Sequence, residues 1–272
     1  MGAFGPRHGR VTGAAPLVQV SRAKGVATIT LCRPDAGNAL SVEMANAISE
    51  AVEGVAGDAE VRCVLMTAQG RFFCVGGDVK SMGVAADVGA LLDRITTPLH
   101  RAITALLQMD KPLVVAVNGP VAGGGLGLAL AGDIVIAAEA AHFSLAYAGI
   151  GFSPDGAATW LLPRLIGFRL TQELVFLNKR LSSAEAAAAG LITSVAKDEE
   201  VLARADEAAM SLAEGPVGAF AATRRLLLAS WQGSAVDQME AEAASVRVQA
   251  ESAEGREGLS AFLQKRRPIF WP

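Results

Sequence analysis

Three consecutive glycines, Gly123 to Gly125 in "VAGGGLGLALAGD" (residues 121–133), constrain the fold of this chain most strongly. Glycine allows positive φ angles and lets another molecule approach the main chain closely, and the N–H groups at the start of a helix attract negative charge. The run therefore predicts backbone amides that are presented to a ligand, with tight packing of a helix against a strand as the alternative. A dinucleotide site is disfavoured, because the glycine spacing is not GxGxxG.

The sequence around this run alternates short strands with helices, which indicates the α/β class. Residues 17–34 alternate apolar and polar side chains and predict two strands that pair around a Lys24-Gly25 turn. A helix is expected at 42–55, and residues 62–78 are expected to form a strand, a turn and a second short strand. Helices then continue to about residue 107. Buried strands follow at 112–119 and within 134–146, and a helix at 157–167. A unit of strand, strand and helix thus recurs over the first two hundred residues.

The pattern changes after Ala196, where no strand signal remains. Residues 201–215, 217–231 and 234–253 are each typical of an amphipathic helix. We therefore expect three parts: a flexible N-terminus at 1–16, an α/β core at 17–197, and a helical region at 198–272. Because the helical region has more apolar surface than a lone extension needs, we expect it to dock on the core or on another subunit.

The composition excludes several classes of partner. The chain is 51% hydrophobic and 19% charged with a formal net charge of −3, so nothing in its electrostatics favours nucleic acid. Three cysteines without CxxC spacing, and the lack of a signal-peptide pattern, predict a reduced cytoplasmic compartment. Residues 112–132 carry no charge, but Asn118, Pro120 and the glycines interrupt them, which indicates buried core rather than a membrane span.

A second glycine turn occurs in "FFCVGGDVK", where Gly76 and Gly77 follow a predicted strand and precede a helix. If the two turns fold together, they aim two backbone N–H groups at one oxygen atom. Such a pair is an oxyanion hole, which stabilises negative charge that develops on a carbonyl oxygen about 3 Å away.

Four motifs carry a resemblance to a known family: "RPDAGNAL" (33–40), "FFCVGGDVKSM" (72–82), "KPLVVAVNGPVAGGGLGLALAGDIVIAAE" (111–139) and "FLQKRRPIF" (262–270). In this order they resemble the crotonase family of enoyl-CoA hydratases and isomerases, over roughly residues 18–270. The resemblance implies a spiral of ββα turns, a helical C-terminal region that forms trimers or hexamers, and an acyl-CoA thioester as the substrate.

The resemblance also implies roles for individual residues. Gly77 and Gly124 match the two positions whose N–H groups hold the thioester oxygen, so the glycine run is expected to stabilise an enolate. Matched positions suggest contacts to CoA from Ala36, Val75, Lys80, Phe262 and Lys265, the last two from this chain or from a neighbouring subunit.

The sequence departs from the family pattern where hydratases carry their two catalytic carboxylates. Those positions are occupied by Gly127 and by Tyr147, and neither residue can act as a carboxylate. Hydration needs groups that activate water and deliver a proton, so the departure disfavours it. We expect Gly127 and Tyr147 to contact the substrate instead, with Tyr147 as an aromatic wall of the acyl pocket or a hydrogen-bond donor.

One carboxylate remains nearby, at Asp155 in "GIGFSPDGAATWLLPRLIG". A structural alternative is that Ser153 caps a helix, Pro154 occupies its first position and Asp155 lies in its first turn. The functional interpretation is that "PDG" resembles the ring-opening and double-bond isomerases of the family, in which an aspartate faces the reacting carbons. The prediction is an enoyl-CoA isomerase with Asp155 as its single acid and base.

Three alternatives stay open: hydration through an unrecognised acid, hydrolytic or dehalogenase-type chemistry with Asp155 as nucleophile, and an acyl-CoA-binding protein without catalysis. Asp78 and Asp133 are expected to satisfy local amides, and residues 92–108 to shape the acyl pocket. The dispersed histidines, His8, His100 and His142, lack metal-ligand spacing, so neither a metal nor a cofactor beyond the CoA of the substrate is expected.

Overall fold

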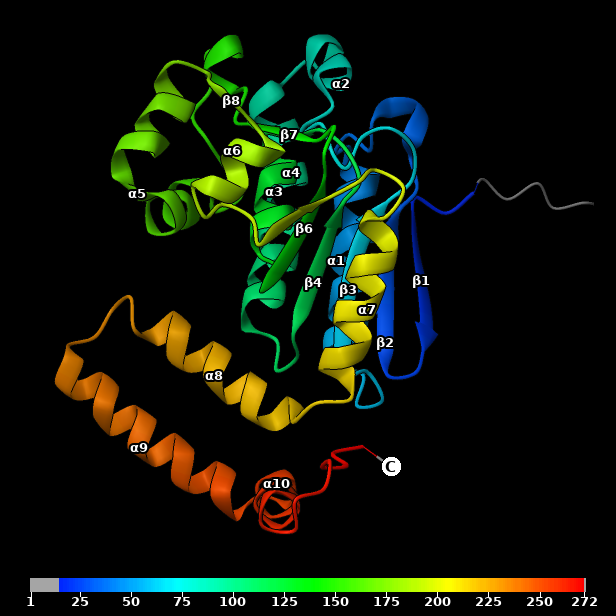
Figure 1. Cartoon of the computed structure of the whole chain (residues 1–272). Helices are drawn as coiled ribbons and strands as arrows, with labels where there is room; N and C mark the ends of the chain where they lie inside the picture. Colours follow the sequence, from blue (N-terminus) through cyan, green and yellow to red (C-terminus); the bar gives the residue numbers. More distant parts are fainter. Residues whose placement is uncertain (1–14, 272) are drawn as a thin grey trace, which may run out of the picture.

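The computed structural model describes residues 15–271, and its centre is a six-stranded sheet in the order β1-β2-β3-β4-β6-β9 (Figure 1). The strands β1 (Val18–Ala23) and β2 (Val26–Leu31) form an antiparallel hairpin, and the other neighbours pair in parallel. Those other strands are β3 (Cys63–Ala68), β4 (Leu113–Val117), β6 (Ile134–Ala138) and β9 (Ser194–Ala196). The predicted turn is confirmed, because Lys24 and Gly25 both have positive φ angles, 50° and 73°.

A second, three-stranded sheet lies beyond the carboxyl ends of β4 and β6, near the top of Figure 1. It has the order β5-β7-β8, with β5 (Val121–Ala122), β7 (His142–Ser144) and β8 (Arg180–Ser182). Because β5 follows β4 and β7 follows β6 along the chain, two strand-strand-helix units deliver their connections to the same end of the molecule. The expected α/β class is confirmed.

Helices cover both faces of the main sheet. Figure 1 shows α7 (Val201–Ala213) in front, where it packs on β2, β3, β4, β6 and β9, and α1 (Val42–Ala56) with α3 (Val88–Gln108) behind. The α1 helix begins at Ser41, whose side chain accepts a hydrogen bond from the Met44 N–H, and it buries a periodic stripe that includes Ile48 and Val52. In α7 the buried stripe is Ala205, Ala209 and Ala213, so the helix approaches the sheet closely.

The remaining elements are shorter or lie further from the sheet. They are η1 (Pro34–Ala36), α2 (Val79–Val84), α4 (Gly124–Leu130), η2 (Tyr147–Ile150), α5 (Ala158–Phe176, kinked at Gly167), α6 (Ser183–Ala188), α8 (Val217–Ala229), α9 (Ala235–Glu251) and α10 (Ala253–Leu263). The segment 72–75, expected to be a short strand, makes only the single bridge Cys74↔Val121. The amide of Asn38 donates to the carbonyls of Gln69 and Phe72, so a side chain occupies positions that a strand partner would use.

The helices α8, α9 and α10 form an arm that extends below the core in Figure 1. The helical C-terminal region is therefore present as expected, although no residue of α9 is buried. Large apolar side chains on the arm are exposed: Leu227, Val236, Met239, Val246, Val248, Leu259, Phe262 and Leu263. The predicted flexible segment 1–16 lies outside the described residues except for its last two positions.

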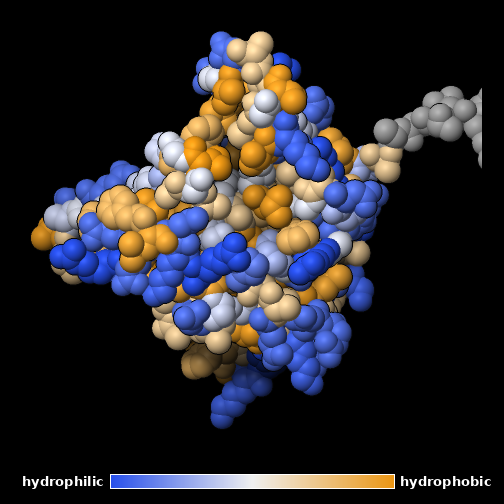
Figure 2. All heavy atoms as spheres, turned by 90° about the horizontal axis from the view of Figure 1, so that it is seen from above, coloured by the Kyte–Doolittle hydropathy of each residue, from blue (hydrophilic) through white to orange (hydrophobic). Residues whose placement is uncertain are grey.

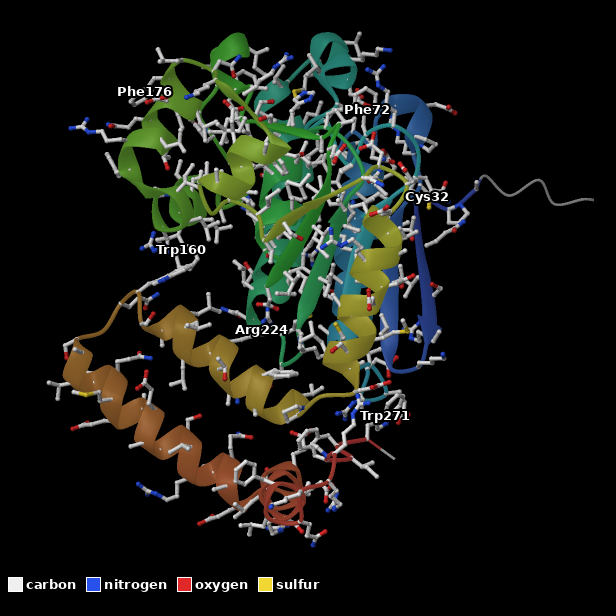
Figure 3. The ribbon with its side chains drawn as sticks, in the orientation of Figure 1. Cys32, Phe72, Trp160, Phe176, Arg224 and Trp271 are labelled. Atoms are coloured by element: carbon white, nitrogen blue, oxygen red, sulfur yellow. The ribbon has the colours of Figure 1, made fainter. Side chains whose placement is uncertain are left out.

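Several contacts join this arm to the core, among them those of Arg224 and Trp231. Arg224 of α8 points toward the strand end below β4 (Figure 3), where it pairs with Asp133 at 2.8 Å and donates to the carbonyls of Leu106, Met109 and Lys111. At the far end of α8, Trp231 packs edge-on against Trp160 of α5, with ring centroids 4.5 Å apart. The guanidinium of Arg164 lies over both rings.

Replacement of Arg224 is expected to loosen the arm. Arg224→Met leaves three carbonyls and Asp133 without their donor, and we expect the free energy of unfolding in urea to fall by about 2–4 kcal/mol. The neighbouring Arg225 pairs with Asp110 at an exposed site, so Arg225→Met is the matched control, with an expected loss below about 1 kcal/mol. Equal losses from the two variants would contradict this account of the attachment.

Candidate active site

The two glycine turns lie against one another. Cys74 and Val121 form a parallel bridge, and the Ala122 N–H donates to the Cys74 carbonyl at 2.9 Å. Gly76 has a φ of 88°, and a Cβ atom there would lie 2.9 Å from the Ala122 carbonyl oxygen. Both the conformation and the space therefore require glycine, as the sequence indicated.

Each position of the run 123–125 requires glycine for a different physical reason. Gly123 has a φ of 52°, which favours glycine. A Cβ on Gly124 would lie 2.9 Å from Leu40 Cδ1, and one on Gly125 would lie 2.6 Å from the Cys74 carbonyl oxygen. Tight packing and presentation of the main chain, the two alternatives left open by the sequence, are both present in this one turn.

Gly77 and Gly124 leave their backbone N–H groups free. On either side of Gly77, Leu40 donates to the Gly76 carbonyl at 2.8 Å and Asp78 donates to the Leu40 carbonyl at 3.1 Å. Within residues 15–271, neither Gly77 nor Gly124 donates its own N–H to another protein group, and both residues line the same cavity. Two unpaired donors at one cavity are the arrangement that a developing oxyanion requires.

This cavity has a volume of about 170 Å³ and a largely apolar wall. One side comes from α3, through Leu92, Ile95, Thr96 and Leu99, so part of the 92–108 segment does line it. Val79 and Met82 from α2 line another side. Figure 2 shows the molecule from above the view of Figure 1, where hydrophobic and hydrophilic residues are interspersed on the surface.

Asp155 is the only carboxylate among the residues that line the cavity. It precedes two residues with left-handed backbone, Gly156 (φ 64°) and Ala157 (φ 61°), and α5 begins only at Ala158. The structural alternative, with Ser153 as the cap and Asp155 in the first helical turn, is therefore wrong, because those φ angles place the helix start further along the chain. No side chain of this turn, Asp155 included, makes a capping hydrogen bond to α5.

His100 contacts this carboxylate, and sequence reasoning missed it. The side chain of His100 reaches from α3 to Asp155, with 2.5 Å between Nε2 and Oδ1. The two residues are 55 positions apart, and a single histidine in an amphipathic helix carries no motif. Only the packing of α3 against the turn at 155–157 brings them together.

Tyr147 lies beside both the glycine turn and Asp155. Built Cβ atoms on Gly123 and Gly124 would lie 3.9 and 3.8 Å from its Cζ and hydroxyl oxygen. Burial raises the pKa of the Tyr147 phenol, and the negative charge of Asp155 raises it further. The phenol therefore stays protonated and keeps an O–H donor at the wall of the cavity.

Gly127 is placed beneath the turn that carries Asp155 and is not among the residues that line the cavity. A Cβ atom on Gly127 would lie 2.1 Å from the Gly156 carbonyl oxygen and 2.8 Å from Ile103 Cδ1. The space that a longer side chain needs at this position is thus filled by the main chain next to Asp155.

The residues expected to contact CoA separate into two groups. Ala36 and Lys80 line an adjoining hollow that shares Val75 and Gly77 with the first cavity. Phe262 and Lys265 line neither the cavity nor the hollow. They belong to α10 and the segment after it, at the opposite end of the molecule in Figure 1. Phe262 is 80% exposed.

Residues 15–271 contain no group of three or more His, Cys, Asp or Glu side chains that could hold a metal ion. None of the helices in this part of the chain combines the length and the apolar character that crossing a membrane requires.

The fold, the paired glycine turns and the cavity agree with a comparison against protein families. Residues 21–271 match the family model described as enoyl-CoA hydratase/isomerase. The chain belongs to this family, the crotonase family that its motifs resemble, and it is an enzyme of the enoyl-CoA hydratase/isomerase type.

Named relatives perform different reactions. The chain is 38% identical to the 1,2-epoxyphenylacetyl-CoA isomerase of Escherichia coli (strain K12), over 91% of this chain and 95% of that protein. It is 32% identical to 4-chlorobenzoyl coenzyme A dehalogenase-2 of an Arthrobacter species, over 73% of each chain. The crystal structure of an enoyl-CoA hydratase from Polaromonas sp. JS666 superposes with a TM-score of 0.88 at 30% identity, over 92% of this chain and 98% of that one.

The contact between Gly127 and Gly156 can be tested directly. Gly127→Ala forces a methyl group against a carbonyl oxygen, so we expect the free energy of unfolding to fall by about 1–3 kcal/mol. Gly54 in α1 is the control, because a Cβ atom there meets nothing within 4 Å, and Gly54→Ala should raise stability by about 0.5–1 kcal/mol. Denaturant unfolding of both variants makes the measurement, and an unchanged Gly127→Ala protein would contradict the contact.

The single tyrosine of the chain makes the ionisation of Tyr147 measurable. A free phenol is half ionised at about pH 10. The raised pKa of Tyr147 predicts that the folded protein shows no tyrosinate absorbance at that pH. Because the unfolded chain then loses a proton that the folded chain keeps, stability should fall as the pH rises above about 10. Ultraviolet titration with and without urea checks this, and tyrosinate in the folded protein near pH 10 would disprove it.

Proposed function

We propose that this protein is an enoyl-CoA isomerase in which Asp155 is the single acid and base. The thioester oxygen of a 3-enoyl-CoA would accept hydrogen bonds from the N–H groups of Gly77 and Gly124. The Asp155 carboxylate would take the α-proton, the negative charge would spread over a dienolate held by the two N–H donors, and the proton would return at the γ-carbon. The double bond moves by one position, and no water is consumed.

One observation carries this proposal: Asp155 is the only carboxylate lining the cavity that also contains the free N–H groups of Gly77 and Gly124. One base is sufficient for a proton transfer between two carbons of the same substrate. The relationship to an acyl-CoA isomerase from E. coli supports the same reaction class.

The packing beneath Asp155 argues against the hydratase alternative. Hydration in this family uses a carboxylate at the position of Gly127, and here the Gly156 carbonyl would lie 2.1 Å from any Cβ atom at that position. The turn that delivers Asp155 and a side chain at 127 therefore compete for one volume. This conflict disfavours a carboxylate side chain at 127 in a chain that carries this turn.

A second candidate reaction uses Asp155 as a nucleophile, and the relationship to the Arthrobacter dehalogenase favours it. The two candidates differ in a measurable way. Enolate chemistry exchanges substrate protons with solvent, whereas attack by a carboxylate releases a leaving group. An acyl-CoA-binding protein without catalysis would do neither.

The CoA portion of the substrate would leave the cavity through the adjoining hollow, past Ala36 and Lys80. The Lys80 ammonium forms no ion pair within residues 15–271, so it is free to meet a phosphate. Phe262 and Lys265 would act from a neighbouring subunit of a homotrimer or of a hexamer. The exposed apolar side chains of α8–α10 support such an assembly.

The first test is incubation with 3-enoyl-CoA substrates in deuterated water. We expect the double bond to move and deuterium to enter the α- and γ-positions, as followed by mass spectrometry. Asp155→Asn should lower turnover by about 10²–10⁴-fold while CoA-thioester binding remains.

Glu139→Gln, which changes an exposed carboxylate between β6 and β7, is the matched control and should behave as the wild type. Full turnover by Asp155→Asn would remove both the isomerase and the nucleophile proposals. Binding without turnover or exchange across several acyl chains would favour the non-catalytic alternative.

A further inference from the structure

The Asp155 carboxylate has a single side-chain partner in the part of the chain that the structure describes. That partner is His100, whose Nε2 lies 2.5 Å from Asp155 Oδ1. Tyr147 lies near enough for the charge of Asp155 to raise its pKa, but within residues 15–271 it forms no hydrogen bond to the Asp155 carboxylate. Because Asp155 lies on an irregular turn before α5, no regular hydrogen-bond ladder fixes its direction. The orientation of the carboxylate toward the cavity thus depends on His100.

The pair also joins the cavity to solvent. Asp155 lines the cavity and its side chain is 29% exposed, whereas the side chain of His100 is 52% exposed and does not line the cavity. No other hydrogen bond to the ring of His100 occurs within residues 15–271, so Nδ1 is available to water. One end of the pair faces the substrate volume and the other faces the solvent.

We infer that His100 is the positioning residue for Asp155 and the route by which the proton on Asp155 exchanges with water; this inference rests on the proposed isomerase function. In the resting pair, the Nε2–H group donates to Oδ1, which leaves Oδ2 to face the substrate. When Asp155 takes the α-proton, the carboxyl group and the imidazole share one additional proton.

That proton can follow either of two routes, and each route conserves protons and charge. It returns directly to the γ-carbon of the dienolate, which restores the carboxylate and carries the original hydrogen into the product. Alternatively, the imidazole ring exchanges it for a solvent proton, and the solvent proton is delivered to the γ-carbon. In each case one proton leaves the substrate, one enters it, and the charge of the pair is unchanged at the end of the cycle.

Two substitutions separate positioning from exchange. His100→Ala removes both, and we expect kcat to fall by about 10- to 100-fold with KM changed by less than about twofold, because a misplaced base affects the chemical step more than binding. His100→Gln places an amide N–H near the position of Nε2 but carries no exchangeable ring proton. It should restore kcat to within about threefold of wild type, while the share of product that carries solvent deuterium falls.

Arg101→Gln, at the next position of α3 and exposed, is the matched control and should match wild type in both rate and labelling. Wild-type kcat in His100→Ala would overturn the positioning role, and so would failure of His100→Gln to restore the rate. Wild-type labelling in His100→Gln would overturn the exchange role. Urea unfolding of each variant shows whether a low rate reflects lost structure, and the Gln variant keeps the test decisive if the Ala variant does not fold.

A separate measurement distinguishes failure of this inference from failure of the proposed function. The chain has three histidines, so the ring nitrogens of His100 can be followed by ¹⁵N NMR without any substrate. Asp155→Asn should shift the His100 signals and leave those of His142 unchanged. If the wild type isomerises no 3-enoyl-CoA but these signals shift, the pair exists and the reaction class is wrong. Unshifted His100 signals would overturn the pair itself.

Discussion

The close approach of two glycine turns is the constraint on which the rest of the site depends. The bridge between Cys74 and Val121 brings the connections after β3 and β4 together, and the main chain of one turn fills the space where the other would carry a Cβ atom. Side chains at these positions would separate the turns and misdirect their amides. With glycine, the N–H groups of Gly77 and Gly124 remain unpaired at one cavity, in a region where most backbone donors are satisfied.

A second close contact decides which acid the cavity contains. The turn at 155–157 rests on Gly127, and its left-handed residues turn Asp155 toward the cavity before α5 begins. A larger residue at 127 would occupy the same volume as the Gly156 carbonyl. A side chain at 127 therefore competes for space with the turn that carries Asp155, which links the packing of α4 to the chemistry proposed for Asp155.

The C-terminal helices have two different structural roles. Helix α7 completes the core by packing on the main sheet, whereas α8–α10 leave it and expose their apolar side chains. Arg224 within α8, and the cluster of Trp160, Trp231 and Arg164 beyond its C-terminal end, hold the arm on the core. Because Trp160 belongs to the first turns of α5, the same attachment steadies the helix that follows the Asp155 turn.

Periodicity and permitted φ angles are local properties of the chain, so they predicted the α/β class, the hairpin at Lys24-Gly25, the helical C-terminus and the need for glycine in both turns. The sequence also selected Asp155, because the other candidate positions carry no carboxylate. Four other features became visible only in the folded chain: residues 72–75 pair at a single bridge, Asp155 lies outside α5, Gly127 lies beneath Gly156, and His100 reaches Asp155. Each of these depends on contacts between residues far apart in the chain, or on φ angles that non-glycine residues such as Ala157 adopt only when the surrounding packing imposes them.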